Sequence, residues 1–256
     1  MFGESLNEIE YYLYLHNMPI YELHPEFVGF PPRTAFELDM VAVGGDLRTE
    51  RLLEAYARGI FPWYNEPGNL HWYCPEERCV LPVESVEVSH SMRSIFRKGE
   101  LTFTMDTAFR EVIEACREGV REGQTWIHDE IVESYVRLHK LGVAHSLEVW
   151  NKQALVGGLY GVSLGKMFFG ESMFSRQPNT SKAALITLCR FLPRIEVDLV
   201  DCQVPNDHLL SMGAEVWHRD LFLDTLEAAI QEPTASGSWK EVFAEWNVHS
   251  INNSVG

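Results

Sequence analysis

The spacing of apolar residues changes twice between residues 106 and 231, and this restricts the fold more than any other feature of the sequence. Residues 106–121 and 129–141 repeat apolar side chains three and four positions apart, as one face of a helix requires. The spacing then becomes that of strands, and helical and strand patterns alternate after them. The predicted strands are 144–150, 155–164, 166–174, 197–204 and 215–218, and the later helices are 179–191, 207–212 and 221–231. This order, with a tight turn at Gly165, predicts an α+β fold.

The first 85 residues lack this regularity. Pro31 and Pro32 interrupt regular structure, so we expect loops and short helices, one of which begins near Thr49 and ends at Gly59. Residues 61–75 are rich in aromatic side chains and proline. We interpret them as irregular chain that forms either domain-interface packing or a stacking surface.

These patterns divide the chain into four parts. Residues 1–26 form an acidic N-terminal extension, and residues 27–85 form a small N-terminal domain. Residues 86–232 form the larger α+β domain, and residues 233–256 are expected to be a flexible C-terminal tail.

The charge of the chain is strongly negative but unevenly distributed. The 256 residues include 37 acidic and 21 basic ones, a formal net charge of −16 at pH 7, which argues against a nucleic-acid partner. Residues 48–98, however, hold seven basic and seven acidic residues, and Ser91–Lys98 holds three cations and no anion. The hydrophobic content of 46 % is that of a soluble globular protein and excludes a disordered chain, a collagen-like fibre and a coiled coil.

Cysteine usage and the absence of targeting signals indicate the compartment. Five cysteines at irregular spacing favour reduced thiols over a disulfide framework. No signal peptide and no apolar run long enough to span a bilayer are visible, so we expect a cytoplasmic protein without membrane contact. His71, Cys74 and Cys79 resemble half of a zinc site, but no second pair of ligands follows, and we expect no metal.

Two predicted strands carry acidic side chains among apolar ones. Glu171 shares a strand face with Met173 and Ser175, whereas Asp201 shares a face with Gln203. Acids in apolar strands are costly unless they are paired or belong to a site. Each acid alone could equally fix a loop at a strand end, but two of them near one sheet edge favour a functional site.

Motifs of common nucleotide-dependent and covalent catalysts are absent. Gly157–Gly161 lacks the G-x-G-x-x-G spacing of dinucleotide-binding turns, and the chain contains no P-loop, G-x-S-x-G or H-E-x-x-H sequence. Glycines within strands indicate instead a bulge or the close approach of a ligand to the backbone.

A series of short motifs occurs in the order found in one enzyme family. They are Val43-Gly-Gly-Asp-Leu47, Arg58-Gly-Ile-Phe-Pro-Trp63, Trp72-Tyr-Cys-Pro75, Thr125-Trp-Ile127, Leu138-His139, His145-Ser-Leu-Glu-Val-Trp150, Val156-Gly-Gly-Leu-Tyr-Gly161, Gly170-Glu-Ser-Met-Phe-Ser-Arg176 and Asp201-Cys-Gln-Val204. On these motifs the sequence closely resembles the leucyl/phenylalanyl-tRNA–protein transferases, over roughly residues 27–225.

The resemblance implies transfer of Leu or Phe from aminoacyl-tRNA to a protein that begins with Arg or Lys. The partners would be Leu-tRNA, Phe-tRNA and the acceptor protein, and the product would enter N-end-rule degradation in the bacterial cytoplasm. Residues 86–232 would form a catalytic domain with a GNAT-type acyltransferase fold. No cofactor is implied, because the tRNA ester is the acyl donor in place of acetyl-CoA.

The resemblance also implies roles for individual residues. Asp201 and Gln203 match the catalytic pair, in which Asp201 would polarise Gln203, and Glu171 matches a third polar residue. Because a neutral amide is a poor base, we expect Gln203 to position the attacking amine. The acidic Asp201 and Glu171 would also favour the cationic acceptor side chain.

The remaining assignments concern the donor. Leu159, Met173 and Leu188 match the aminoacyl pocket, and Trp63, Trp126 and Tyr135 match residues around the terminal adenosine of the tRNA. From the local charge, Arg78, Arg93, Arg97 and Lys98 are expected to contact tRNA phosphates.

Two alternatives remain open. An acyltransferase that uses acyl-CoA would need a glycine-containing pyrophosphate loop, which residues 175–181 do not provide. A non-enzymatic module that binds RNA or protein N-termini would bind both ligands without turnover.

Overall fold

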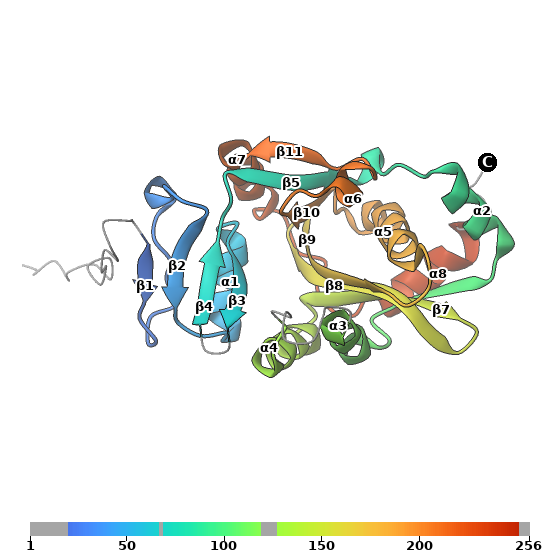
Figure 1. Cartoon of the computed structure of the whole chain (residues 1–256), viewed down its shortest axis with the longest axis horizontal. Helices are drawn as coiled ribbons and strands as arrows, with labels where there is room; N and C mark the ends of the chain where they lie inside the picture. The colour runs from blue at the N-terminus through green and yellow to red at the C-terminus, as the bar shows by residue number, and fades with distance from the viewer. Residues whose placement is uncertain (1–19, 67–68, 119–126, 251–256) are drawn as a thin grey trace, which may run out of the picture.

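The computed structural model describes residues 20–66, 69–118 and 127–250, which form two sheets with helices packed on them (Figure 1). The small sheet belongs to the N-terminal part of the chain and contains four strands. The large sheet contains seven strands and is built mainly from the C-terminal part. No helix within the described ranges is long and apolar enough to cross a membrane.

The small sheet has the strand order β1-β2-β4-β3. β1 and β2 are parallel, whereas β2 with β4 and β3 with β4 are antiparallel. Helix α1 covers this sheet and buries Leu52, Ala55 and Tyr56. The bounds are Tyr21–Leu23 for β1, Met40–Gly44 for β2, Thr49–Ala57 for α1, Phe61–Glu66 for β3 and Asn69–Tyr73 for β4, with a short 3-10 helix at Arg33–Ala35.

Regular strands at Phe61–Glu66 and Asn69–Tyr73 contradict the prediction of irregular chain there. β3 and β4 pair antiparallel, and Pro62 lies opposite Trp72. Aromatic side chains are favourable in strands, and β3 is the edge strand of its sheet, where the missing N–H of a proline is tolerated. The proline that suggested irregular structure therefore marks a sheet edge.

The large sheet has the strand order β11-β5-β10-β9-β8-β7-β6. β9 and β10 are parallel, and every other neighbouring pair is antiparallel. At the turn between β8 and β9, Gly165 has a φ of +54°, and a Cβ there would lie 2.0 Å from the carbonyl oxygen of Ala229. The strands are β5 Glu77–Pro82, β6 Leu101–Met105, β7 Ala144–Asn151, β8 Ala154–Leu164, β9 Met167–Ser175, β10 Leu199–Gln203 and β11 Glu215–His218.

Helices cover both faces of the large sheet (Figure 1). α3 (Phe109–Glu118) and α4 (Asp129–Lys140) lie on one face, and α5 (Thr180–Phe191) lies on the other. α2 (His90–Lys98) packs against α5 and β6. Two short helices, α6 (Asp207–Leu210) and η2 (Val83–Ser85), a further 3-10 turn at Leu192–Ile195, and α7 (Arg219–Ala229) complete this part. Every helix and strand predicted between residues 106 and 231 is present.

One hydrophobic cluster joins the two sheets. It contains Phe61 and Trp72 from the small sheet, Val80 and Phe222 from the large part, and the buried faces of α3 and α4. The second cluster lies on the opposite face of the large sheet, under α2 and α5. The small sheet is therefore packed as part of the main core.

The sheet topology moves the predicted domain boundaries. β5 pairs with β10 and β11 in the large sheet, although the prediction placed residues 77–82 in the small domain. The small domain ends with β4 at Tyr73, and it begins by Tyr21, since β1 pairs with β2.

The C-terminal segment is packed, which contradicts the prediction of a flexible tail from residue 233. Helix α8 (Lys240–Ser250) follows Trp239, and the side chains of Trp239 and Phe243 are 3 % and 1 % exposed. The Trp239 ring stacks on the His145 ring at 3.5 Å between centroids. The backbone N–H of Trp239 donates to Asp106 Oδ2 at 2.8 Å. Only the Gly- and Ser-containing connection at residues 233–238 resembles a loop, so its composition was a poor guide to the helix after it.

Candidate active site

The site lies where the pairing of β9 with β10 ends. β10 pairs with β9 only from Leu199 to Asp201, although β9 continues to Ser175. A cavity of about 350 Å³ occupies the region beyond this point, bordered also by α5 and the segment after β10. Its volume is at the lower end of the range for small-molecule sites.

The walls of this cavity are mainly apolar. Leu159 from β8, Met173 from β9 and Leu188 from α5, the three residues predicted to form an aminoacyl pocket, line this one cavity. Phe168, Leu185, Val200 and Leu209 extend the same wall. The structure therefore brings together residues that are as much as 146 positions apart in the chain, from Trp63 to Leu209.

The polar end of the cavity is organised around Glu171. Tyr56 Oη donates to Glu171 Oε1 at 2.8 Å, and Tyr135 Oη donates to Oε2 at 2.9 Å. Gln203 Nε2 donates to Oε1 at 2.8 Å, and the two tyrosine hydroxyls are also in contact. Because each hydroxyl has one proton, a tyrosine that donates to the other tyrosine accepts from, instead of donating to, a protonated Glu171. Four separate elements, α1, α4, β9 and β10, thus meet at one carboxyl group.

This environment changes the protonation of Glu171. Burial raises the pKa of the Glu171 carboxyl from 4.5 to about 7, the tyrosine hydrogen bonds oppose this rise, and the charge of Asp201 adds to it. Burial, followed by the Glu171 charge, holds the pKa of Tyr56 and Tyr135 well above the ordinary value of 10. Near neutral pH, the Glu171 carboxyl can therefore gain or lose a proton, whereas both tyrosines stay protonated.

Asp201 and Arg78 form a buried ion pair beside this group. Arg78 Nε lies 2.8 Å from Asp201 Oδ1 and Nη2 lies 2.6 Å from Oδ2, and the two side chains are 1 % and 0 % exposed. Burial lowers the pKa of Arg78, but the charge and hydrogen bonds of Asp201 outweigh it and raise the pKa. The prediction that Arg78 contacts tRNA phosphates is wrong, because its guanidinium is enclosed and already paired.

Asp201 contacts the backbone of Gln203. Asp201 Oδ1 accepts the Gln203 N–H at 2.9 Å, while the Gln203 side chain bonds to Glu171. Gln203 has a φ of +62°, and the pairing of β10 with β5 shifts register between Asp201 and Gln203. The Asp201–Gln203 relation predicted from sequence exists, but it fixes a bulged backbone instead of polarising the amide.

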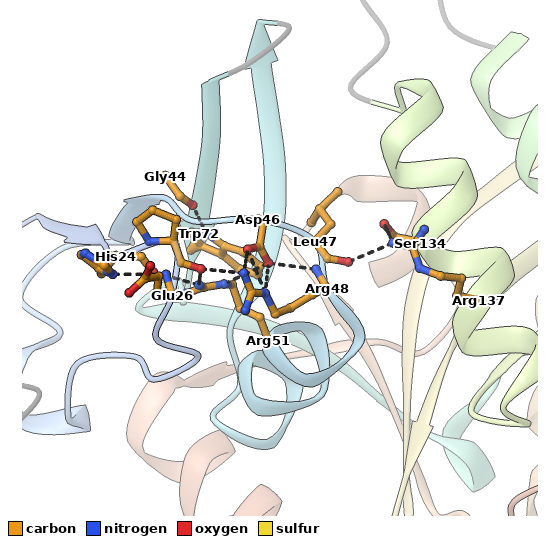
Figure 2. A network of polar contacts seen from close by, with 11 residues as sticks. His24, Glu26, Gly44, Asp46, Leu47, Arg48, Arg51, Trp72, Ser134 and Arg137 are labelled. Atoms are coloured by element: carbon orange, nitrogen blue, oxygen red, sulfur yellow. Dashed lines mark hydrogen bonds and ion pairs between the residues drawn. The ribbon is translucent and has the colours of Figure 1, made fainter.

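A second polar network fixes the helices that carry the tyrosines (Figure 2). Asp46, at the start of α1, binds Arg48 and Arg51, and Arg51 Nη2 also donates to the carbonyl of His24 at 2.9 Å. Gly45 has a φ of +74°, and a Cβ there would lie 3.1 Å from the buried Arg51 guanidinium. Gly45 therefore suits both its left-handed backbone and the close approach of the Arg51 guanidinium.

The same loop reaches α4. Arg137 donates to the carbonyl of Leu47 at 3.4 Å and to Ser134 Oγ at 2.7 Å (Figure 2). α1 and α4, which supply Tyr56 and Tyr135, are therefore tied together away from the site.

Trp63 stands between the first cavity and a second one. Its side chain is 36 % exposed and borders both. The second cavity has a volume of about 680 Å³, and its described lining contains three carboxylates and no cation. The lining residues are Asp39, Phe61, Trp63, Tyr73, Pro75, Glu76, Glu77, Val204 and Pro205.

The other predicted donor contacts have different positions. Trp126 lies outside the described residues. Tyr135 is fully buried and bonded to Glu171, so it presents no ring face to an adenosine, which corrects that prediction. Arg93, Arg97 and Lys98 are exposed on α2, at the end of the molecule opposite the small sheet (Figure 1).

Sequence reasoning missed Tyr56 and the acidic residues of the second cavity. Tyr56 lies on the buried face of an amphipathic helix, where a tyrosine is most simply a core residue. Glu76 and Glu77 are adjacent at the start of β5, whereas Asp39 precedes β2, far from them in the sequence, and none of the three belongs to a motif. Only the tertiary structure could identify them.

The next features of the site region concern its cysteines and its possible metal ligands. The five cysteines are free thiols, and four of them are buried. Within the described residues, no group of His, Cys, Asp or Glu has the arrangement of a metal site.

An apolar cavity that ends on a proton-exchanging carboxyl and a fixed amide suits a transferase that positions an apolar acyl group. Comparison with known proteins specifies this class. Residues 80–227 match the family model for leucyl/phenylalanyl-tRNA protein transferase, and residues 45–76 match the model for its N-terminal domain. The chain belongs to the leucyl/phenylalanyl-tRNA–protein transferase family, whose members are enzymes.

Individual relatives match along nearly their whole length. The leucyl/phenylalanyl-tRNA–protein transferase of Myxococcus xanthus is 49 % identical, and the match covers 88 % of this chain and 97 % of the relative. That of Maridesulfovibrio salexigens is 46 % identical, with 90 % and 98 % covered.

Solved structures are more distant. A GCN5-related N-acetyltransferase-like protein from Streptococcus suis is 14 % identical, with 77 % of this chain and 76 % of that chain covered and a TM-score of 0.30. Similarity at this level does not assign the fold, which is a mixed α/β architecture with a small N-terminal domain.

Proposed function

We propose that the protein transfers Leu or Phe from aminoacyl-tRNA to the N-terminal Arg or Lys of acceptor proteins and so marks them for N-end-rule degradation. The observation that carries this proposal is the apolar cavity that ends on Glu171 and Gln203. Membership in the family supports the reaction class.

The reaction needs alignment more than activation. The acceptor α-amine attacks the ester carbonyl, a C–N bond forms, and the bond to the ribose oxygen breaks. One proton leaves the amine, and one proton reaches the departing ribose oxygen. An ester is already activated, so neither a nucleotide nor a covalent intermediate with the enzyme is required.

The donor side chain occupies the first cavity. Leu159, Met173 and Leu188 surround a Leu or Phe side chain, and the adaptable Met173 suits two shapes. Such an apolar wall excludes polar aminoacyl groups, which would lose their hydration, but separates similar apolar groups poorly. Trp63, together with Trp126, stacks on the terminal adenosine.

Gln203 orients the attacking amine, and Glu171 exchanges a proton with it. Because Gln203 Nε2 is held by Glu171, the carbonyl oxygen of the same amide is oriented to accept an N–H of the attacking amine. Glu171, with a pKa of about 7, is close to the 7.7–8.0 typical of an α-amine and can exchange a proton with it. Tyr56 and Tyr135 stabilise the carboxylate form during this exchange.

The acceptor cation occupies the second cavity. Asp201 and Glu171 are engaged by Arg78 and by the tyrosines, so they are poor partners for an incoming Arg or Lys. Glu76 and Glu77 are exposed at the second cavity, which adjoins the first through Trp63, Val204 and Pro205. Three carboxylates also repel a phosphate chain, so this cavity suits the protein substrate better than the RNA.

Cations on α5 and α2 form a path for tRNA phosphates. Lys182 on α5 lies close to His208 on α6, since burial and then the Lys182 charge lower the pKa of His208. Arg190 lies 5.8 Å from the Phe96 ring of α2, and burial and then the charge of Arg93 lower its pKa. The path continues through Arg93, Arg97 and Lys98.

The strand order of residues 77–250 supports a GNAT-type fold. Three consecutive antiparallel strands, β7 to β9, are followed by α5 and by β10 parallel to β9. The ligand cavity lies where that parallel pair separates, as expected for a ligand at the carboxyl ends of parallel strands.

Transfer is tested directly with labelled Leu-tRNA or Phe-tRNA and a peptide that begins with Arg. We expect label in the peptide, none with an acetylated N-terminus, and a rate that falls steeply with salt. Reversal of charge at Arg93, Arg97 and Lys98 should flatten that salt dependence. Absence of transfer with fully charged tRNA would refute the proposed function.

A further inference from the structure

Arg78 makes a contact that stability alone does not explain. Its guanidinium presents two nitrogens to both oxygens of Asp201, and its carbon lies 4.3 Å from the Phe222 ring centroid and 4.9 Å from that of Phe61. Within the described residues, its third nitrogen is buried and has no hydrogen-bond partner. Buried ion pairs are often no more stabilising than apolar replacements. A pair with one such unsatisfied nitrogen therefore calls for another role.

The consequence of the pair appears two residues further along β10. The same Asp201 Oδ1 that binds Arg78 also accepts the N–H of Gln203, which has a φ of +62°. A residue other than glycine rarely adopts this left-handed backbone conformation, which costs about 1 kcal/mol or more. The Asp201 oxygen is thus one of the groups that hold Gln203 in a strained conformation.

The strained conformation decides where the Gln203 amide points. With this backbone, Gln203 Nε2 reaches Glu171 Oε1 at 2.8 Å and the residue lines the cavity. An ordinary extended backbone at the same position would continue the strand and direct the side chain elsewhere.

We propose that Arg78 is a positioning residue for the transfer reaction: by fixing both carboxylate oxygens of Asp201, it keeps Gln203 in the left-handed conformation that presents its amide to Glu171. This inference rests on the proposed function for its effect on turnover. Arg78 itself touches no substrate, since it is enclosed behind Asp201 and two aromatic rings.

The test is the substitution Arg78→Lys, which keeps the charge but cannot make two parallel bonds. Loss of one charge-assisted bond predicts a fall in kcat of about 10- to 100-fold. The KM values for aminoacyl-tRNA and acceptor peptide should stay within about twofold. Arg219→Lys is the matched control, because Arg219 bonds to the carbonyls of Phe36, Leu38 and Cys74 and not to Asp201. It should lower the melting temperature and leave kcat nearly unchanged.

A double-mutant cycle separates positioning from general damage. If Arg78 acts through Gln203, then Arg78→Lys combined with Gln203→Ala should have the same kcat as Gln203→Ala alone. Effects that multiply in the double variant would overturn the proposal. So would a kcat for Arg78→Lys equal to that of the unsubstituted protein.

Two further measurements test the proposal even if Arg78→Lys folds poorly or the unsubstituted protein has no transfer activity. Arg78→Gln with Asp201→Asn removes both charges of this buried pair, so it should fold, yet kcat should fall at least about tenfold because the paired charged bonds are lost. Unchanged kcat in this variant would also overturn the proposal. Independently of activity, hydrogen exchange at the Gln203 N–H should accelerate at least about tenfold in Arg78→Lys. If the unsubstituted protein transfers nothing but this exchange accelerates, the proposed function fails and the positioning role stands; unchanged exchange refutes the positioning role.

Discussion

Replacement of Glu171 by Gln should stabilise the protein at alkaline pH while reducing its activity. The pKa of Glu171 rises from 4.5 to about 7 in the folded protein, mainly because of burial. A carboxyl with a raised pKa favours the folded state while it is protonated, so the free energy of unfolding falls as the pH rises from about 4.5 through about 7. The full difference corresponds to about 3 kcal/mol above pH 8.

Urea unfolding of both proteins at several pH values measures this effect. Near pH 4.5, the two free energies of unfolding should nearly agree, because the Glu171 carboxyl is neutral in the folded protein and only about half ionised in the unfolded chain. Glu171→Gln should become more stable as the pH rises, by about 3 kcal/mol at pH 8.5 and with an unchanged urea m-value. Exposed Glu111→Gln is the control and should change stability by less than about 0.5 kcal/mol.

The outcome also bears on catalysis. If Glu171 exchanges the amine proton, kcat of Glu171→Gln should fall by about 10²- to 10⁴-fold, and kcat of the unsubstituted protein should rise with pH through about 7. A stability difference that is the same at pH 5 and pH 8.5, or a variant that is less stable at pH 8.5, would refute the reasoning.

Three further predictions concern other parts of the molecule. Leu188→Trp fills the 350 Å³ cavity and should raise the KM for Leu-tRNA and Phe-tRNA at least about tenfold in steady-state assays; unchanged KM would place the acyl group elsewhere. The double variant Glu76→Gln with Glu77→Gln should raise the KM for a peptide that begins with Arg about fivefold, whereas its KM for a peptide that begins with the uncharged citrulline should not change. The control variant Glu84→Gln should leave the KM for the Arg-peptide unchanged. An equal rise for both peptides would contradict the charge argument. Trp239→Ala should lower the free energy of urea unfolding by about 3–5 kcal/mol, and a loss below about 1 kcal/mol would show that the packing of Trp239 contributes little to stability.

The part of the fold with regular spacing was predictable from the sequence. Between residues 106 and 231, apolar periodicity identified each helix and strand, because those elements bury one consistent face or both faces. The β3–β4 pair was missed, since the proline that argued against a strand is tolerated on an edge. α8 was missed because its burial depends on His145 and Asp106, which are almost a hundred residues away or more.

The site could be predicted only in part, for an electrostatic reason. Glu148 and Glu171 are both single acids in apolar strands, and the sequence does not separate them. The structure does: Glu148 accepts hydrogen bonds from Thr104, Ser146 and the backbone at the start of α3, so it is structural. Glu171 instead lines the cavity. Arg78 was misassigned for a similar reason, since charge alone cannot show whether an arginine faces solvent or another charge.

The position of Trp63 between the two cavities has a consequence for the order of events. In the proposed complex, one indole ring borders the donor and the acceptor, so the orientation that suits one substrate is the surface met by the other. Thermodynamic reciprocity then requires that the donor change the affinity for the acceptor by the same factor as the acceptor changes the affinity for the donor. In that complex we expect the two recognition events to be coupled through the wall that the cavities share, which is Trp63 together with Val204 and Pro205.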